Sequence, residues 1–305
     1  MKSIKILFCA LITLILSSNI LADDYADKLD KLMAEFDNAG MFSGNVILAK
    51  DGNIVFEKSY GYADWDSKTP VTSSTLFNIC SLNKMFTHSM ILQLQKEGTL
   101  SVNDPLNKYL KIFPDDIGGK ITIQMLIEMK AGLNDYLRDP AFIQNIDKFK
   151  TVNDFLEIIK DEPLLFEPGT EQEYSNSGYV VLGGIIEKVT GKSYTENLME
   201  RFFAPLGIKD AYYKQIGDNA PNCASGTLLT YKSEKKSDSF QGMPSPAGGL
   251  YMNANDLLKF ENFLKTADLI PQGIRAGGSP GWNSIFAQYK NGYTLIITSH
   301  LGCRR

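Results

Sequence analysis

The sequence is poor in the residues that build metal sites. The chain of 305 residues contains two histidines, His88 and His300, and four cysteines, and no two cysteines lie close together in sequence. A zinc knuckle or a histidine-rich site is therefore unsupported. Basic residues are not concentrated either: 31 lysines and arginines stand against 35 acidic residues with no basic stripe, so nothing favours a nucleic-acid partner. The content of 44% hydrophobic and 22% charged residues is typical of a folded globular protein.

The N-terminus differs from the rest of the chain. Lys2 and Lys5 precede an almost entirely apolar run over residues 6–16, and a cleavage site follows at Ala22. This pattern is typical of a secretory signal peptide over residues 1–22. Its apolar run is shorter than a transmembrane helix needs. We therefore expect an exported protein, periplasmic or secreted, with no stable membrane anchor once the signal is cleaved.

The mature chain keeps an odd number of cysteines, namely Cys80, Cys223 and Cys303. At most one disulfide can form within the chain, so one thiol stays free or pairs with a partner. The sequence does not decide which of the three it is.

Two hairpin signals lie at opposite ends of the chain. One pair of strand-like runs is joined by Asp51-Gly52 and the other by Asn291-Gly292, and both dipeptides favour the tight turns of β-hairpins. We predict that the two hairpins pair into one antiparallel sheet. The four predicted strands are residues 45–50, 53–58, 283–289 and 293–299.

The predicted helices lie mainly between the two hairpins. Leu29, Leu32, Met33 and Phe36 recur at helical spacing and predict an amphipathic helix over 24–38. The remaining helices are expected at 81–97, 121–130, 151–160, 177–190, 194–203 and 254–265. The pattern predicts an α+β fold for residues 23–305, with a sheet subdomain at about 23–75 and 245–305 and a mainly helical subdomain at about 76–244.

The pair Ser81 and Lys84 is the strongest chemical signal in the sequence. Ser81 opens a predicted helix and could simply be its N-cap, but a capping serine prefers Glu or Gln three residues later. A lysine there is disfavoured by the positive end of the helix dipole. Residues three apart share a helix face, and the dipole and burial both favour the neutral amine. A neutral Lys84 could take the proton of an attacking Ser81.

The sequence around this pair resembles the serine β-lactamase-related family, which includes class C β-lactamases, D-alanyl-D-alanine carboxypeptidases and related esterases. The resemblance covers most of residues 40–300 in the family's order. Its segments are Leu76 to Thr87, Leu92-Gln93-Leu94, Glu97-Gly98-Thr99-Leu100, Asp104-Pro105-Leu106, Tyr109-Leu110, Glu167-Pro168-Gly169-Thr170, Tyr174 to Tyr179, Pro246 to Tyr251 and Gly277 to Asn283.

The resemblance assigns roles to the first and third residues of the second motif, Tyr174-Ser175-Asn176. Tyr174 would share proton transfer with Lys84, and Asn176 would hold the substrate amide by donating and accepting. A tyrosine is normally protonated near pH 7, but a nearby ammonium group favours its phenolate. The family chemistry needs no metal or organic cofactor, so only a small-molecule or cell-wall peptide substrate is implied.

The third motif aligns on Arg275-Ala276-Gly277, where the family has Lys or His in place of Arg275. The arginine keeps the positive charge and could bind a substrate carboxylate, but it cannot titrate. The resemblance places the oxyanion hole at the backbone N–H groups of Ser81 and Gly278.

The segment Gly277-Gly278-Ser279-Pro280-Gly281 also fits a second serine-nucleophile motif, Gly-x-Ser-x-Gly. There the residue after the serine must give its N–H to the oxyanion hole. Pro280 has no N–H, which argues against Ser279 as the nucleophile.

Three departures from the family pattern leave the activity open. First, residues 128–133 stand where the family often has His-Thr-Ser-Gly-Leu. Second, only ten residues separate Leu264 from Arg275, where family members usually have several tens. Third, the sequence ends at Arg305, where relatives continue into a helix that covers the sheet. An open sheet face would then need a partner. We expect an exported serine acyl hydrolase for D-alanyl peptides, β-lactams or small esters. The alternative is a catalytically impaired, penicillin-binding-like sensor or binding module.

Overall fold

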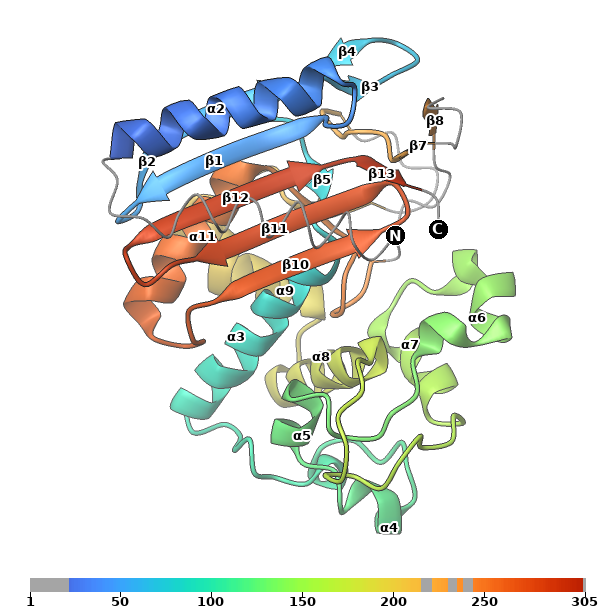
Figure 1. Cartoon of the computed structure of the whole chain (residues 1–305). Helices are drawn as coiled ribbons and strands as arrows, with labels where there is room; N and C mark the ends of the chain where they lie inside the picture. Colours follow the sequence, from blue (N-terminus) through green and yellow to red (C-terminus); the bar gives the residue numbers. More distant parts are fainter. Residues whose placement is uncertain (1–21, 215–220, 230–234, 238–243, 304–305) are drawn as a thin grey trace.

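A computed structural model describes residues 22–214, 221–229, 235–237 and 244–303 (Figure 1). Except for Ala22, the expected signal peptide lies outside these ranges. Within them no helix is both long and apolar enough to cross a membrane. Cys80 and Cys223 are not joined in a disulfide, and the side chain of Cys303 is not described.

The two predicted hairpins pair as expected and supply four strands of a five-stranded antiparallel sheet, ordered β10-β11-β12-β1-β2. The hairpins meet where β1 pairs with β12, with Ile47 opposite Ile296. This arrangement confirms the predicted α+β fold. The strands are β1 (Gly44–Lys50), β2 (Asn53–Tyr60), β10 (Ile274–Ser279), β11 (Trp282–Gln288) and β12 (Tyr293–Ser299).

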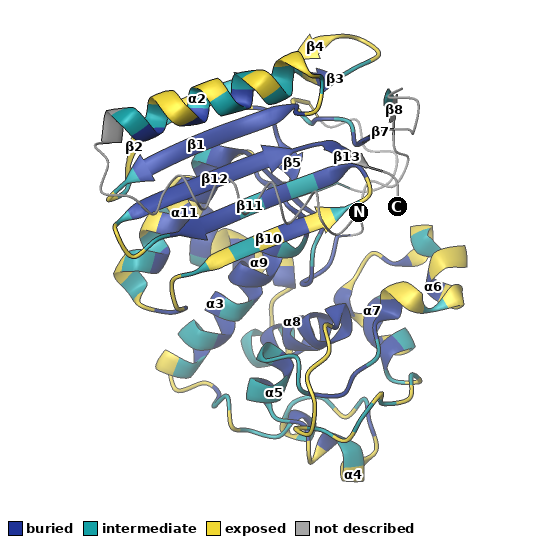
Figure 2. Ribbon diagram, viewed as in Figure 1, coloured by how far each residue is buried: buried dark blue, intermediate teal, exposed yellow. Residues whose placement is uncertain are grey.

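Helix α2 (Ala22–Asn38) covers one face of this sheet (Figures 1 and 2). Its Tyr25, Leu29 and Met33 are buried in one cluster with strand residues such as Val46 and Leu48. Each such side chain contributes about 1.5–3 kcal/mol when fully buried. On the same face, Ile274 of the edge strand β10 remains 54% exposed. A partner that covers this end of the sheet stays a prediction.

Helix α11 packs against the other face of the sheet, and α3, whose first residue belongs to the predicted site, lies beside it (Figure 1). The predicted helix 81–97 begins as the 3₁₀ turn η1 and continues as α3. The helices are η1 (Cys80–Asn83), α3 (Lys84–Lys96), η2 (Leu106–Lys108), α4 (Asp115–Gly118), α5 (Ile123–Ile127), η3 (Tyr136–Arg138), α6 (Pro140–Gln144), η4 (Ile146–Lys148), α7 (Val152–Ile159), α8 (Asn176–Thr190), α9 (Tyr194–Leu198), the π-helical turn η5 (Met199–Phe203), α10 (Ala204–Leu206) and α11 (Ala254–Ala267).

Short strands form a second, three-stranded sheet ordered β5-β9-β6. β5 (Phe77–Asn78) pairs with β9 (Leu250–Met252), which also pairs with β6 (Tyr212–Tyr213), so the turn that carries Ser81 is anchored at its start. The other short strands are β3 (Tyr62–Asp64), β4 (Thr69–Pro70), β7 (Thr227–Leu229), β8 (Lys235–Ser237) and β13 (Leu301–Cys303).

Aromatic packing fixes α3 between the sheet and the remaining helices. Phe86 stacks on Phe260 of α11 with ring centroids 3.9 Å apart and meets Phe202 and Phe203 edge-on. Edge-to-face pairs of this kind add about 0.5–1.5 kcal/mol beyond burial alone. The ring contacts of Phe86 therefore hold the first turn of α3 against η5 and α11.

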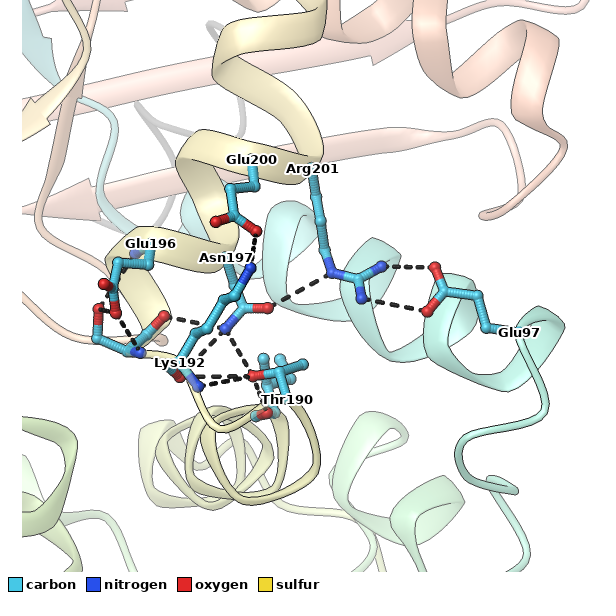
Figure 3. A network of polar contacts seen from close by, with 9 residues as sticks. Glu97, Thr190, Lys192, Glu196, Asn197, Glu200 and Arg201 are labelled. Atoms are coloured by element: carbon cyan, nitrogen blue, oxygen red, sulfur yellow. Dashed lines mark hydrogen bonds and ion pairs between the residues drawn. The ribbon is translucent and has the colours of Figure 1, made fainter.

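A polar network holds the opposite end of α3 (Figure 3). Arg201 donates to both carboxylate oxygens of Glu97, at 2.7 and 3.1 Å, and its Nε donates to Asn197. Asn197 in turn donates to Thr190 at the end of α8. The bidentate pair has the geometry that an arginine makes best. It ties the end of α3 to α8 and η5, the helices that neighbour the site.

Candidate active site

Ser81 lies on the 3₁₀ turn that follows β5, and its side chain does not cap a helix. Neither η1 nor α3 has a side-chain N-cap hydrogen bond. Instead Ser81 Oγ lies 2.7 Å from the hydroxyl of Tyr174 and accepts from Lys84 Nζ at 3.2 Å. The residue before it, Cys80, has φ of +50°, an unusual backbone state for a side chain other than glycine. The side chain of Asn78 stabilises this backbone conformation, because its Oδ1 accepts a hydrogen bond from the Cys80 N–H at 2.9 Å.

Lys84 is the first residue of α3 and is 7% exposed. Its Nζ donates to Ser81 Oγ, to Asn176 Oδ1 at 2.7 Å and to the Ala247 carbonyl at 2.7 Å. Burial lowers the pKa of Lys84 to about 7, against the opposing effect of the Asp135 carboxylate. A large fraction of Lys84 is therefore neutral near pH 7, with a lone pair for the Ser81 proton.

Tyr174 stands on the other side of Ser81. Its ring is 46% exposed, yet partial burial raises the pKa of its hydroxyl above the usual value. Burial disfavours the charged form, so the phenol is favoured over the phenolate. Lys84 Nζ also lies 5.0 Å from the centre of the Tyr174 ring. Tyr174 is a phenol that can donate a proton, and Lys84 is the candidate base.

Asn176 begins α8, and both ends of its amide are occupied. Its Oδ1 accepts from Lys84, and its Nδ2 donates to Asp135 Oδ2 at 2.9 Å. The amide retains one N–H and one lone pair for a substrate. Sequence reasoning missed Asp135, which lies 41 residues before Asn176 and follows residues 128–133, a segment that departs from the family pattern.

The edge strand β10 brings Gly277 against the nucleophile turn. A Cβ at this position would lie 2.3 Å from the Ile79 carbonyl and 2.9 Å from the Ser81 nitrogen. Ser284 of β11 donates to the same Ile79 carbonyl at 2.7 Å. Only glycine permits this approach. Gly278 follows as an exposed residue, and its place in the oxyanion hole stays a prediction.

Arg275 lies two residues before Gly277 on β10. Its guanidinium donates to the Pro271 carbonyl at 2.5 Å and to Gln288 Oε1 at 3.4 Å. No hydrogen bond in the described part of the chain joins it to Ser81, Lys84 or Tyr174. Its role in substrate binding therefore stays a prediction.

His88 lies one turn beyond Lys84 on α3. Burial, and to a lesser degree the charge of Arg275, lowers the pKa of His88 to about 4. His88 is therefore neutral at pH 7, and Lys84 occupies the position beside Ser81 that a base would need.

A protein-family model described as Beta-lactamase matches residues 27–293. The chain belongs to the beta-lactamase family. Family members are serine hydrolases, and the geometry of Ser81, Lys84 and Tyr174 is consistent with that chemistry.

Curated relatives share the family sequence over part of their length. Protein flp of Staphylococcus aureus strain N315 is 32% identical over 213 residues, which cover 68% of this chain and 42% of that protein. Penicillin-binding protein 4* of Bacillus subtilis is 35% identical over 191 residues, covering 60% of this chain and 41% of the relative. The matches thus span about two fifths of these relatives.

Solved structures share the beta-lactamase fold at low identity. A penicillin-binding protein from Bacillus halodurans superposes with a TM-score of 0.80 at 22% identity, covering 88% of this chain and 94% of that one. A D-amino acid amidase from Ochrobactrum anthropi has a TM-score of 0.75 at 24% identity, covering 89% of each chain.

Proposed function

We propose that this protein is an exported serine acyl hydrolase that works through an acyl-enzyme. The observation that carries the proposal is the position of Ser81 Oγ, 3.2 Å from a buried amine and 2.7 Å from a phenol. A nucleophile flanked by one group that can take a proton and another that can give one is suited to acyl transfer.

Acylation follows from these positions. Neutral Lys84 takes the Ser81 proton while Oγ bonds to the substrate carbonyl carbon, and the carbonyl π electrons move to its oxygen. The N–H groups of Ser81 and Gly278 hold this oxyanion. When the carbonyl re-forms, the bond to the leaving group breaks and the leaving group takes the Tyr174 proton. Lys84 then gives its proton to the Tyr174 phenolate, whose ring centre lies 5.0 Å from Lys84 Nζ, so both residues return to their starting states.

Deacylation reverses the order with water as the nucleophile. The water loses its proton to the Lys84–Tyr174 pair and bonds to the acyl carbon. The ester bond to Ser81 Oγ breaks, and Oγ recovers the proton. The acid is released and the residues return to their starting states.

The substrate is proposed from the chemistry of the site and the names of the relatives. Penicillin-binding protein and D-amino acid amidase point to D-alanyl peptides, β-lactams and other acyl compounds. A related structure is titled as a hydrolase with promiscuous acyltransferase activity, which supports small esters as well. Arg275 still has N–H donors beyond its two protein contacts, and we assign it to a substrate carboxylate.

The test is intact-mass spectrometry of the mature chain mixed with a reactive penicillin. We expect a mass gain of one acyl group that is lost in Ser81→Ala and kept in Ser279→Ala, the matched control on β10. An adduct in both wild type and Ser81→Ala would overturn the assignment of the nucleophile. A folded protein that neither forms an adduct nor hydrolyses an activated ester would overturn the proposal.

Adduct lifetime separates the hydrolase from the sensor alternative. The sensor alternative rests on Arg275, where the family has Lys or His, and on its contacts with Pro271 and Gln288. Rapid turnover would exclude a sensor, whereas an adduct stable for hours with no ester turnover would favour it.

A further inference from the structure

The carboxylate of Asp135 lies behind the candidate nucleophile and base. Asp135 is 7% exposed, and its two oxygens have different partners. Oδ2 accepts from Asn176 Nδ2 at 2.9 Å, and Oδ1 accepts from the Leu137 N–H at 3.1 Å. The mechanism proposed above gives this buried group no role.

The contact with Asn176 removes the ambiguity of the amide. A carboxylate only accepts hydrogen bonds, so the end of the Asn176 amide that faces Asp135 must be the NH₂ group. Its carbonyl oxygen must then face Lys84 Nζ, 2.7 Å away. This orientation leaves the amine as donor to Asn176 and to the Ala247 carbonyl. In the neutral amine these two bonds use both N–H groups, so the lone pair is the position left for Ser81 Oγ, 3.2 Å away.

A turned amide would have the opposite effect. An N–H of Asn176 would then point at Lys84 and donate to the lone pair of the neutral amine. That lone pair could no longer take the Ser81 proton. The amide orientation that the acceptor-only carboxylate of Asp135 requires therefore keeps the N–H groups of Asn176 away from the lone pair of Lys84.

We propose that Asp135 is a positioning residue of the acyl-transfer site, whose carboxylate fixes the amide of Asn176 and thereby reserves the lone pair of Lys84 for Ser81. This inference rests on the proposed function, because it assigns Asp135 a part in the same proton transfer.

The charge of Asp135 also acts on the proton affinity of Lys84. Burial is the main reason for the low pKa of Lys84, and the Asp135 carboxylate raises that pKa. The other titratable groups that face Lys84 are Cys80, Tyr174 and Tyr179. Removal of the Asp135 charge should therefore lower the pKa of Lys84 further. General loosening of the site would do the reverse, because water around the amine returns its pKa towards 10.5.

The first measurement needs no catalysis. Lysine labelled with ¹³C at Cε is introduced into wild type, D135N and D139N, and the Lys84 resonance, identified by its loss in K84M, is titrated by NMR. Asp139 lies on the same loop and caps α6, and asparagine is an equally good N-cap, so D139N matches the charge change without touching Asn176. We expect the Lys84 pKa to fall by about one unit in D135N and to stay in place in D139N.

The second measurement is the pH dependence of kcat/KM for an activated ester. We expect the ascending limb to move to lower pH in D135N together with the NMR pKa, and the alkaline plateau to fall about tenfold, as expected when a general base is misaligned. An unchanged or raised Lys84 pKa in D135N would overturn the proposal for Asp135. If wild type is inactive and unreactive, the proposed function fails, while the NMR titration still decides whether Asp135 controls Lys84.

Discussion

The backbone of Gly277 packs directly on the backbone nitrogen of Ser81. A Cβ on Gly277 would lie 2.9 Å from that nitrogen, so the edge of the sheet and the turn that carries the nucleophile touch without an intervening side chain. The position of the Ser81 N–H, which the proposed mechanism uses for the oxyanion, therefore depends on one residue of β10.

Substitution Gly277→Ala is expected to impair acylation strongly. The added methyl group would also lie 2.6 Å from Ser284 Oγ, so β10 or the turn must move. Loss of one oxyanion donor costs about 10²–10³-fold in rate, and we expect a fall of about 100-fold in kcat/KM. The control is Gly273→Ala, where a Cβ would meet nothing within 4 Å. Equal activities of the two variants would contradict the role of this contact.

Lys84 should set the acidic limb of the pH profile. Because its pKa is about 7, the reactive neutral amine is lost as the pH falls, and kcat/KM should drop about tenfold per unit below pH 7. Lys84→Arg should reduce the rate by about 10²–10⁴-fold at every pH, because arginine does not release its proton. A limb that persists in Lys84→Arg would assign the titration to another group.

Tyr174→Phe tests the phenol as a proton donor. The raised pKa of Tyr174 keeps it protonated through the working range, so the acidic limb should stay near pH 7 while the rate falls about 100-fold. Thermal stability should change little, since the ring is 46% exposed. Tyr62→Phe, at another exposed tyrosine, serves as the control. Disappearance of the limb in Tyr174→Phe would show that Tyr174, not Lys84, titrates there.

His88 should make the fold sensitive to acid. Its pKa is about 4 in the folded state against 6.5 when unfolded, so the unfolded chain binds more protons between these values. The free energy of unfolding should fall with decreasing pH by up to about 1.4 kcal/mol per unit in this window. Urea unfolding of wild type and His88→Gln at pH 7, 5.5 and 4.5 measures the difference. Parallel curves for the two proteins would rule out this contribution.

Arg275→Gln should separate substrates by charge. If the guanidinium binds a substrate carboxylate, acylation by a penicillin should weaken about tenfold, while a neutral ester should be unaffected, because only the former loses a charge-assisted bond. Arg138→Gln, at an exposed arginine paired with Glu173, is the matched control. A similar loss for both substrates would mean that Arg275 acts through its contacts with Pro271 and Gln288 alone.

Local patterns were enough to predict much of the fold. Asp51-Gly52 and Asn291-Gly292 mark two hairpin turns, and the strands on either side are recognisable in the sequence. Two hairpins can pair into one sheet in only a few ways, and the structure has one of them. Strand β10 was not predicted, because its Ala-Gly-Gly core has low strand propensity and is held by its pairing with β11.

The candidate site was predictable to a similar extent. Ser81 and Lys84 lie close because they are three residues apart, and family resemblance supplied Tyr174 and Asn176. Asp135 was missed because its contact with Asn176 spans 41 residues, and no short motif marks it. The protonation state of Tyr174 depends on burial, which a sequence does not display.

The hydrogen bond from Ser284 to the Ile79 carbonyl joins residues 205 positions apart in the chain. A contact of such high sequence separation forms slowly, because the long intervening loop must close before the contact is gained. Helix hydrogen bonds join residues close in sequence, but the junction between β10, β11 and the nucleophile turn needs residues 205 positions apart to meet. Refolding followed by circular dichroism should therefore recover helix signal well before acylating activity returns, so that activity reports the closure of the whole molecule.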